Sequence, residues 1–134
     1  MTTTLSMVHI LVDDPEAALA FYRDTLGLTV KMDVARGDFR WITLVTDSQP
    51  EIGIVLSQPH GGRSQEEGDA VAALLAKGEM YPAHFRTDDL DGTFEKIAAT
   101  PGVEVLQEPA SQPWGVRDAA VRDPAGNRLR IEQA

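Results

Sequence analysis

The residues of this sequence best suited to chemistry are His9 and His84, which occupy equivalent places in two similar segments. His9 opens HILVDDPEAALAFY, and His84 opens HFRTDDLDGTFEKI 75 residues further along the chain. An imidazole can bind a metal ion, move a proton near neutral pH or form a hydrogen bond with a ligand. The role of the pair therefore depends on the elements that carry the two histidines and on the face to which each one points.

Composition narrows the classes of function. The chain has 134 residues, a length typical of one domain, and 43% of them are hydrophobic, which is enough for a packed core. Its formal net charge of -9 disfavours binding to nucleic acid or to an anionic membrane surface. There is no cysteine, which excludes disulfides, zinc–thiolate clusters and thiol catalysis. We find neither a signal peptide nor a run of about 20 apolar residues, and so expect a cytoplasmic protein.

The first segment has the pattern of a strand followed by a helix. Residues 7–12 are mostly apolar, with the even-numbered ones on one predicted face and His9 on the other. Asp14 has the features of an N-cap and Pro15 suits the first helical turn, from which apolar spacing continues the helix to Leu26. Three more strands are predicted at 28–34, 39–46 and 52–57.

The second segment repeats this order. An offset of 75 places Asp88 on Asp13, Asp89 on Asp14 and Gly102 on Gly27. The predicted elements are a strand at 83–87, a helix that starts at Asp88-Asp89, and strands at 103–107, 115–122 and 129–132. The chain therefore reads as an internal duplication of a βαβββ unit. We predict an α+β fold in which two tandem modules, 5–58 and 81–134, form a cleft and are joined by a connector at 59–80.

The connector starts with the polar, glycine-rich sequence PHGGRSQEEG, and its apolar residues over 70–76 predict a short helix. It could act as a lid over the cleft. The simpler interpretation is a plain connector with one packed helical turn, in which His60 is solvated.

Both segments resemble one known family. The matching sequences are VDDPEAALAFYRDTLGL in the first module, and RTDDLDGTFEKI and PWGVRDAAVRDPAGNRLRI in the second. They resemble the vicinal oxygen chelate superfamily, the glyoxalase, bleomycin-resistance and dioxygenase group, over essentially the whole chain. The resemblance implies the cleft-forming fold and a frequent homodimer. It does not imply one activity, because the fold carries both enzymes and pure binding proteins.

The enzymes of this family usually hold one divalent metal in the cleft, through His and Glu on the first and last strand of each module. Carried over by spacing, those positions are Met7, Gly53, Pro82 and Arg130 here. None of the four is a plausible ligand, and a fixed positive charge would oppose a dication. We therefore expect no metal. The alternative is a set shifted by two residues, His9, His84 and Glu132, since two His and one carboxylate bind non-haem iron and similar metals.

Strand alternation gives further residues that face the cleft. Ile42 and Leu44 should pack under the helix, which turns Phe39, Trp41 and Thr43 toward the cleft. The ligand-binding candidates are His9, Trp41, His84, Arg86, Trp114 and Arg130. Trp41 could stack on a planar ligand, and two arginines suggest an anionic or carbonyl-bearing one. Alternatively, Trp41 is a core aromatic, and the arginines pair with carboxylates such as Asp118 and Glu132.

Two main hypotheses follow. The first is a metal-independent small-molecule binding protein that resembles bleomycin-resistance proteins, working without a cofactor and as a homodimer. The second is a lyase or dioxygenase of the glyoxalase kind, with a divalent metal ion at the shifted His/His/Glu set. A metal-free lyase or isomerase with a histidine base is a third option. No catalytic residue is identified, and the sequence does not indicate the ligand.

Overall fold

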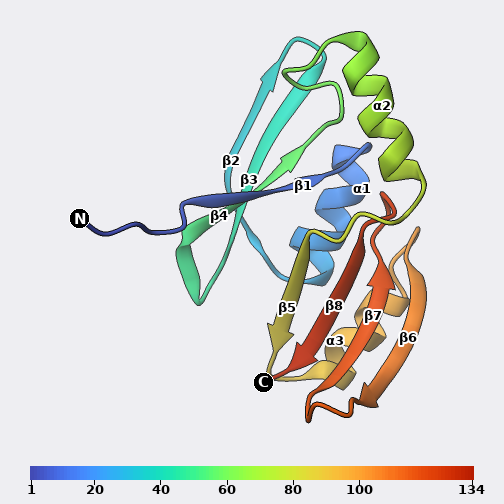
Figure 1. The fold of residues 1–134 in the computed structure, drawn as a ribbon. Coiled ribbons are helices and arrows are strands. Elements are labelled where there is room, and N and C mark those ends of the chain that lie inside the picture. Colours follow the sequence, from blue (N-terminus) through green and yellow to red (C-terminus); the bar gives the residue numbers. More distant parts are fainter.

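Each copy of the repeat builds its own four-stranded sheet (Figure 1). The computed structural model describes residues 1–134. The N-terminal sheet has the order β1-β4-β3-β2 and the C-terminal sheet the order β5-β8-β7-β6. In each sheet the first strand pairs parallel with the last strand of its module, and the remaining pairs are antiparallel. The predicted α+β fold with two βαβββ modules is confirmed.

The strands lie close to their predicted positions. They are β1 (Met7–Leu11), β2 (Thr29–Arg36), β3 (Phe39–Thr46), β4 (Gln49–Ser57), β5 (Ala83–Thr87), β6 (Glu104–Ser111), β7 (Arg117–Arg122) and β8 (Arg128–Gln133). β3 and β5 have the predicted bounds. Pro50, expected in a turn, lies within β4 instead. It is tolerated there because β1 pairs with β4 only from Gly53 onward.

The helix of the first module differs from the prediction. It begins as α1 (Pro15–Leu19), where the Asp14 carboxylate accepts hydrogen bonds from Glu16 N at 3.1 Å and Ala17 N at 3.3 Å. From Ala20 to Thr25 it widens into the π-helix η1, in which Leu26 N donates to Phe21 O at 2.9 Å. The apolar pattern predicted one continuous helix because it cannot distinguish an i−5 bond from an i−4 bond.

The other two helices are α2 (Gln65–Ala76) and α3 (Leu90–Ala98). Ser64 caps α2 by accepting a hydrogen bond from Glu67 N at 3.2 Å, which starts this helix five residues before the predicted Ala70. In the second module, Asp89 caps α3 and accepts from Gly92 N at 3.0 Å. No helix is long and apolar enough to span a bilayer.

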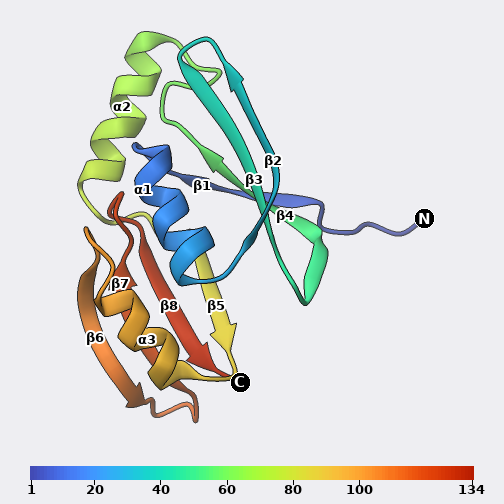
Figure 2. The same cartoon turned by 180° about the vertical axis from the view of Figure 1, so that it is seen from behind.

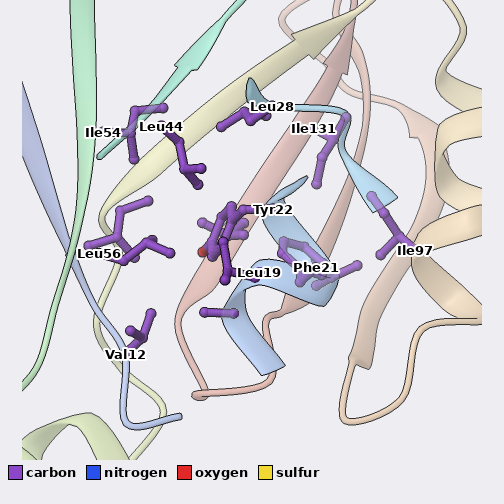
Figure 3. Close-up of a cluster of buried hydrophobic side chains, with 14 of the residues drawn as sticks. Val12, Leu19, Phe21, Tyr22, Leu28, Leu44, Ile54, Leu56, Ile97 and Ile131 are labelled. Atoms are coloured by element: carbon purple, nitrogen blue, oxygen red, sulfur yellow. The ribbon is translucent and has the colours of Figure 1, made fainter. Parts of the chain in front are cut away.

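α1 and α3 cover the same side of the molecule, as Figure 2 shows, and one continuous core lies between them and the two sheets. The core has 17 buried residues drawn from both modules, among them Phe21 and Tyr22, each 0% exposed (Figure 3). Ile42 and Leu44 are also fully buried in it, on the helix-covered side of β3. The predicted alternation of β3 is therefore confirmed.

Buried polar contacts join the two modules across this core. The phenol of Tyr22 donates a 2.5 Å hydrogen bond to Asp123 Oδ2, and Asn127 Nδ2 donates to Leu11 O at 2.7 Å. Both Asp123 and Asn127 belong to the DPAGN turn that precedes β8. Burial is the main cause that raises the pKa of Asp123, while hydrogen bonds from Tyr22 and Asn127 act in the opposite direction.

The faces of the two sheets that point away from α1 and α3 differ in chemistry. On the N-terminal sheet, apolar side chains remain 40% to 48% exposed: Met7, Met32, Val34, Phe39 and Trp41. The C-terminal sheet instead carries a polar network in which Asp118, only 3% exposed, binds Arg130 and Gln112. Exposed apolar area concentrated on one sheet face indicates a surface for a ligand or a partner.

Candidate ligand-binding site

A cavity of about 640 Å³ lies on the uncovered face of the N-terminal sheet. Its floor is apolar and aromatic and comes from β2 and β3: Met32, Val34, Phe39 and Trp41. His9 and Ser57 contribute from β1 and β4, and part of the wall comes from the connector. We call this cavity the Trp41 pocket. Its volume lies within the range of about 300–1,000 Å³ that is usual for small-molecule sites.

The register of β2 and β3 explains why these side chains meet. Trp41 pairs with Val34, and Phe39 pairs with Arg36. Residues directly opposite each other project to the same face of a sheet. Neighbouring residues of a strand point to opposite faces, and Ile42 is buried in the core. Trp41 therefore points outward, where it is 45% exposed. The sequence predicted this orientation for both Phe39 and Trp41.

His9 and Ser57 form a polar corner beside the aromatic floor. His9 Nδ1 lies 2.7 Å from Ser57 Oγ, within hydrogen-bond distance. The His9 ring meets Trp41 edge to face, with ring centroids 5.7 Å apart and an interplanar angle of 72°. Sequence reasoning did not select Ser57, because no motif surrounds it. The feature that could have indicated Ser57 is its position on β4. It lies two residues beyond Val55, which pairs with His9, and therefore points to the same face of the sheet as His9.

The connector is part of the pocket wall, through Gly61, Gly62 and Arg63. It is held by His60, whose Nε2 lies 2.8 Å from Asp69 Oδ1 on α2 and whose ring packs against Gly68. The hydrogen bond with His60 is the main cause that lowers the pKa of Asp69. The His60 side chain is 33% exposed, so it is partly solvated as expected, but the sequence did not predict its contact with α2.

The remaining candidates lie on the C-terminal module, outside the Trp41 pocket. His84, Arg86 and Glu132 line a second, wider groove of about 1140 Å³. Arg130 Nη1 forms an ion pair with Asp118 Oδ2 at 3.0 Å, and Arg86 Nη2 lies 3.6 Å from Glu132 Oε2. Both arginines thus pair with carboxylates of the chain, which was the alternative to their binding a ligand. Trp114 lies in the loop between β6 and β7 and is 65% exposed.

The residues present do not fit the metal of the related enzymes. Met7 and Gly53 pair in register on β1 and β4, but a thioether and an absent side chain offer no hard donor. At the fourth position, the guanidinium of Arg130 cannot bind a cation. The shifted set does not converge within the chain either, because His9 lines one cavity and His84 the other. No group of three or more His, Cys, Asp or Glu side chains could hold a metal ion.

Residues 4–131 match the model of the Glyoxalase/Bleomycin resistance protein/Dioxygenase superfamily. The chain belongs to this superfamily. The fold predicted from the resemblance and the two-module architecture observed here agree with that membership.

Sequence relatives include two bacterial proteins. The Bacillus subtilis protein YurT, named as uncharacterized, is 30% identical over 127 residues, which cover 95% of this chain and 96% of YurT. The Mycobacterium bovis protein CFP32, which carries a provisional glyoxylase name, is 32% identical over 126 residues. That match covers 93% of this chain but 42% of CFP32, so the chain spans about two fifths of this relative's length.

Solved structures share the fold over the full chain. UcmS2 superposes with a TM-score of 0.85 at 30% identity, with complete coverage of both chains. TnmS3, described as an antibiotic binding protein from Streptomyces sp. CB03234, has a TM-score of 0.72 at 24% identity. It covers 98% of this chain, which covers 96% of TnmS3. At that identity, the similarity to TnmS3 shows the fold alone.

Proposed function

We propose that this protein binds a small organic molecule in the Trp41 pocket without the help of a metal ion. The observation that carries the proposal is the pair of half-exposed aromatic rings, Phe39 and Trp41, on the floor of the 640 Å³ cavity. Exposed aromatic and apolar side chains around a concave site are typical of ligand-binding pockets. Polar groups nearby, at His9 and Ser57, can orient a carbonyl or hydroxyl of the ligand.

The fold is compatible with this role, since TnmS3 has the same fold and is described as an antibiotic binding protein. The lyase or dioxygenase hypothesis receives less support from the residues. Its chemistry depends on a divalent cation that polarises the substrate, and Met7, Gly53, Pro82 and Arg130 stand at the customary ligand positions. A binding role needs none of these positions to be filled by His or Glu.

A homodimer is part of the proposal. Leu5 is 58% exposed and Met7 46%, and neither belongs to the lining of the Trp41 pocket. Apolar side chains that are left in water beside a ligand site are suited to burial against a second copy. Light scattering of the purified protein tests this directly. A mass close to twice 14.6 kDa is expected, and a mass of 14.6 kDa at all concentrations would contradict the dimer.

The binding role is tested with chelator-treated protein and the neutral apolar dye N-phenyl-1-naphthylamine. We expect saturable binding without added metal, and Trp41→Ala should weaken it by about tenfold through loss of the aromatic contact. Trp114→Ala is the matched control, because Trp114 lies outside the pocket and its replacement should leave the affinity near that of the unmodified chain. Equal effects of the two substitutions, or binding only after a divalent metal is added, would contradict the proposal.

A further inference from the structure

The Trp41 pocket has a charge balance opposite to that of the whole chain. The chain has 21 acidic and 12 basic residues, for a net charge of -9. The side of the cavity formed by β2, β3 and the connector nevertheless includes Arg36, Arg40 and Arg63, and no Asp or Glu is among its lining residues. Asp38 lies nearby in the β2–β3 turn but does not line the cavity.

The three arginines are not equally available to a ligand. Arg40 alternates with Phe39 and Trp41 along β3, and so its side chain starts toward the other face. Its guanidinium is bound by two carboxylates, those of Asp33 at 2.7 Å and of Glu16. These contacts raise the pKa of Arg40, with the hydrogen bond to Asp33 as the largest cause. Arg40 is thus already neutralised within the chain.

Arg36 and Arg63 carry the available positive charge. Arg36 has no side-chain hydrogen bond or ion pair, and it projects on the pocket face of β2 together with Val34. The Arg63 side chain makes one hydrogen bond, of 3.0 Å from Nη1 to the carbonyl oxygen of Pro59. That bond positions the side chain and leaves the remaining N–H donors free. Guanidinium groups with spare donors are well suited to carboxylate, sulfonate and phosphate oxygens.

We propose that the pocket selects a planar apolar molecule that carries an anionic group, with its rings on Trp41 and its anion paired with Arg36, Arg63 or both. This inference rests on the proposed binding function and adds the chemical class of the ligand. The acidic chain as a whole repels anions. Arg36 and Arg63 are the lining arginines without a carboxylate partner, and we attribute a preference for an anion to their local field. Charges beside a low-dielectric apolar floor act more strongly on a bound ion than charges in open water.

The test compares two dyes with the same aromatic frame. 8-Anilino-1-naphthalenesulfonate carries a sulfonate, and N-phenyl-1-naphthylamine lacks it. We expect the sulfonate dye to bind the unmodified chain about tenfold more tightly, a difference of about 1.4 kcal/mol. The measured quantity is the ratio of the two dissociation constants, which separates the contribution of the anion from that of the rings. Raising the salt concentration should lower the ratio, because exposed guanidinium groups are screened.

Substitutions assign the preference to the two arginines. The double variant Arg36→Gln/Arg63→Gln should bring the ratio of dissociation constants close to one, while Arg36→Lys/Arg63→Lys should keep most of it. Arg117→Gln is the matched control, since Arg117 pairs with Asp91 on the other module and should leave the ratio unchanged. Thermal unfolding of each variant, compared with the unmodified chain, checks that the substitutions leave the fold intact.

The outcomes separate the two proposals. A ratio near one for the unmodified chain, with both dyes weakened by Trp41→Ala, would overturn the anionic class and leave the binding function standing. A high ratio that survives the double Gln variant would also overturn the assignment to Arg36 and Arg63. If neither dye depends on Trp41, the binding function fails and the inference fails with it.

Discussion

The hydroxyl oxygens of Thr25 and Thr100 lie 2.7 Å apart, and the two residues are separated by 75 positions, the offset between the two sequence copies. Equivalent residues of two copies of a repeat touch each other where they lie close to the axis that relates the copies. Each hydroxyl is also within hydrogen-bond distance of a backbone carbonyl oxygen in its own module. Thr25 Oγ1 lies 3.2 Å from Ala20 O, and Thr100 Oγ1 lies 2.9 Å from Lys96 O. The contact therefore links the ends of the two equivalent helices.

The Thr25–Thr100 contact should be measurable as a coupling energy. In a double-mutant cycle with Thr25→Val and Thr100→Val, we expect the free energies of unfolding to be non-additive by about 0.5–1 kcal/mol. Urea unfolding of the four proteins gives this value. As a control, Thr25→Val combined with Thr87→Val should be additive, because Thr87 pairs with Thr93 instead. Additivity in both cycles would mean that the two hydroxyls do not interact in solution.

Tyr22→Phe should destabilise the protein by about 1–3 kcal/mol. The substitution keeps the packing of a ring that is 0% exposed and removes only the hydrogen bond to the buried Asp123 carboxylate. Urea unfolding measures the loss. Tyr81→Phe is the matched control, because Tyr81 is 46% exposed and its hydroxyl has no hydrogen-bond partner within the chain. An equal loss for the two variants would argue against the link between modules.

Asp123 should also make stability depend on pH in a defined direction. Burial raises its pKa above the ordinary 3.8, so the folded chain holds the proton more tightly than the unfolded chain does. The resulting stabilisation is full below about pH 3.8. It is lost as the pH rises through the folded-state pKa. The unmodified chain should therefore lose stability relative to Asp123→Asn as the pH rises through this window.

Urea unfolding of both proteins at a series of pH values checks this dependence. The titration of the other acidic residues is common to both proteins and cancels in the difference between their unfolding free energies. Glu51→Gln, which makes the same charge change at an exposed position, controls for net charge. A difference that grows in favour of the unmodified chain with rising pH would contradict the raised pKa.

Gly68→Ala should have opposite effects in two backgrounds. A β-carbon at Gly68 would lie 2.2–2.9 Å from three atoms of the His60 ring, so in the unmodified chain the ring must move, which disturbs its contacts with α2 beside the pocket wall. We expect lower stability and weaker dye binding. In a His60→Ala background the clash is absent, and the better helix propensity of alanine should stabilise α2 by about 0.5–1 kcal/mol. The same effect in both backgrounds would show that His60 does not pack on Gly68.

Much of the fold could be predicted because the signals are local and occur twice. Alternation along β3 placed Ile42 in the core and Trp41 outside it, and the offset of 75 assigned the elements of the second module from those of the first. Asp14 was recognised as a cap from the sequence, and the offset of 75 placed Asp89 at the equivalent position, where it caps α3. These features need only the period of a strand and the chemistry of a helix start.

The features of the site that the sequence did not predict depend on contacts between residues far apart in the chain. The pairing of Ser57 with His9, 48 residues away, requires the register of β1 and β4. To predict that the connector forms part of the pocket wall, one must know that His60 packs against Gly68. The ion pairs of Arg40 with Asp33 and Glu16 likewise could not be predicted, because they form only when β3, β2 and α1 are brought together. Of the six predicted ligand-binding residues, the Trp41 pocket brings together His9 and Trp41.

The central claim, that a small molecule binds over Trp41 in the absence of metal, is tested most directly by NMR of the two indole N–H groups. The chain has two tryptophans, so Trp41→Phe and Trp114→Phe assign the two Nε1–H signals. Titration of chelator-treated protein with N-phenyl-1-naphthylamine should shift the Trp41 signal in a saturable way and leave that of Trp114 in place. A shift of the Trp114 signal alone, or no shift until a divalent metal is added, would contradict the account.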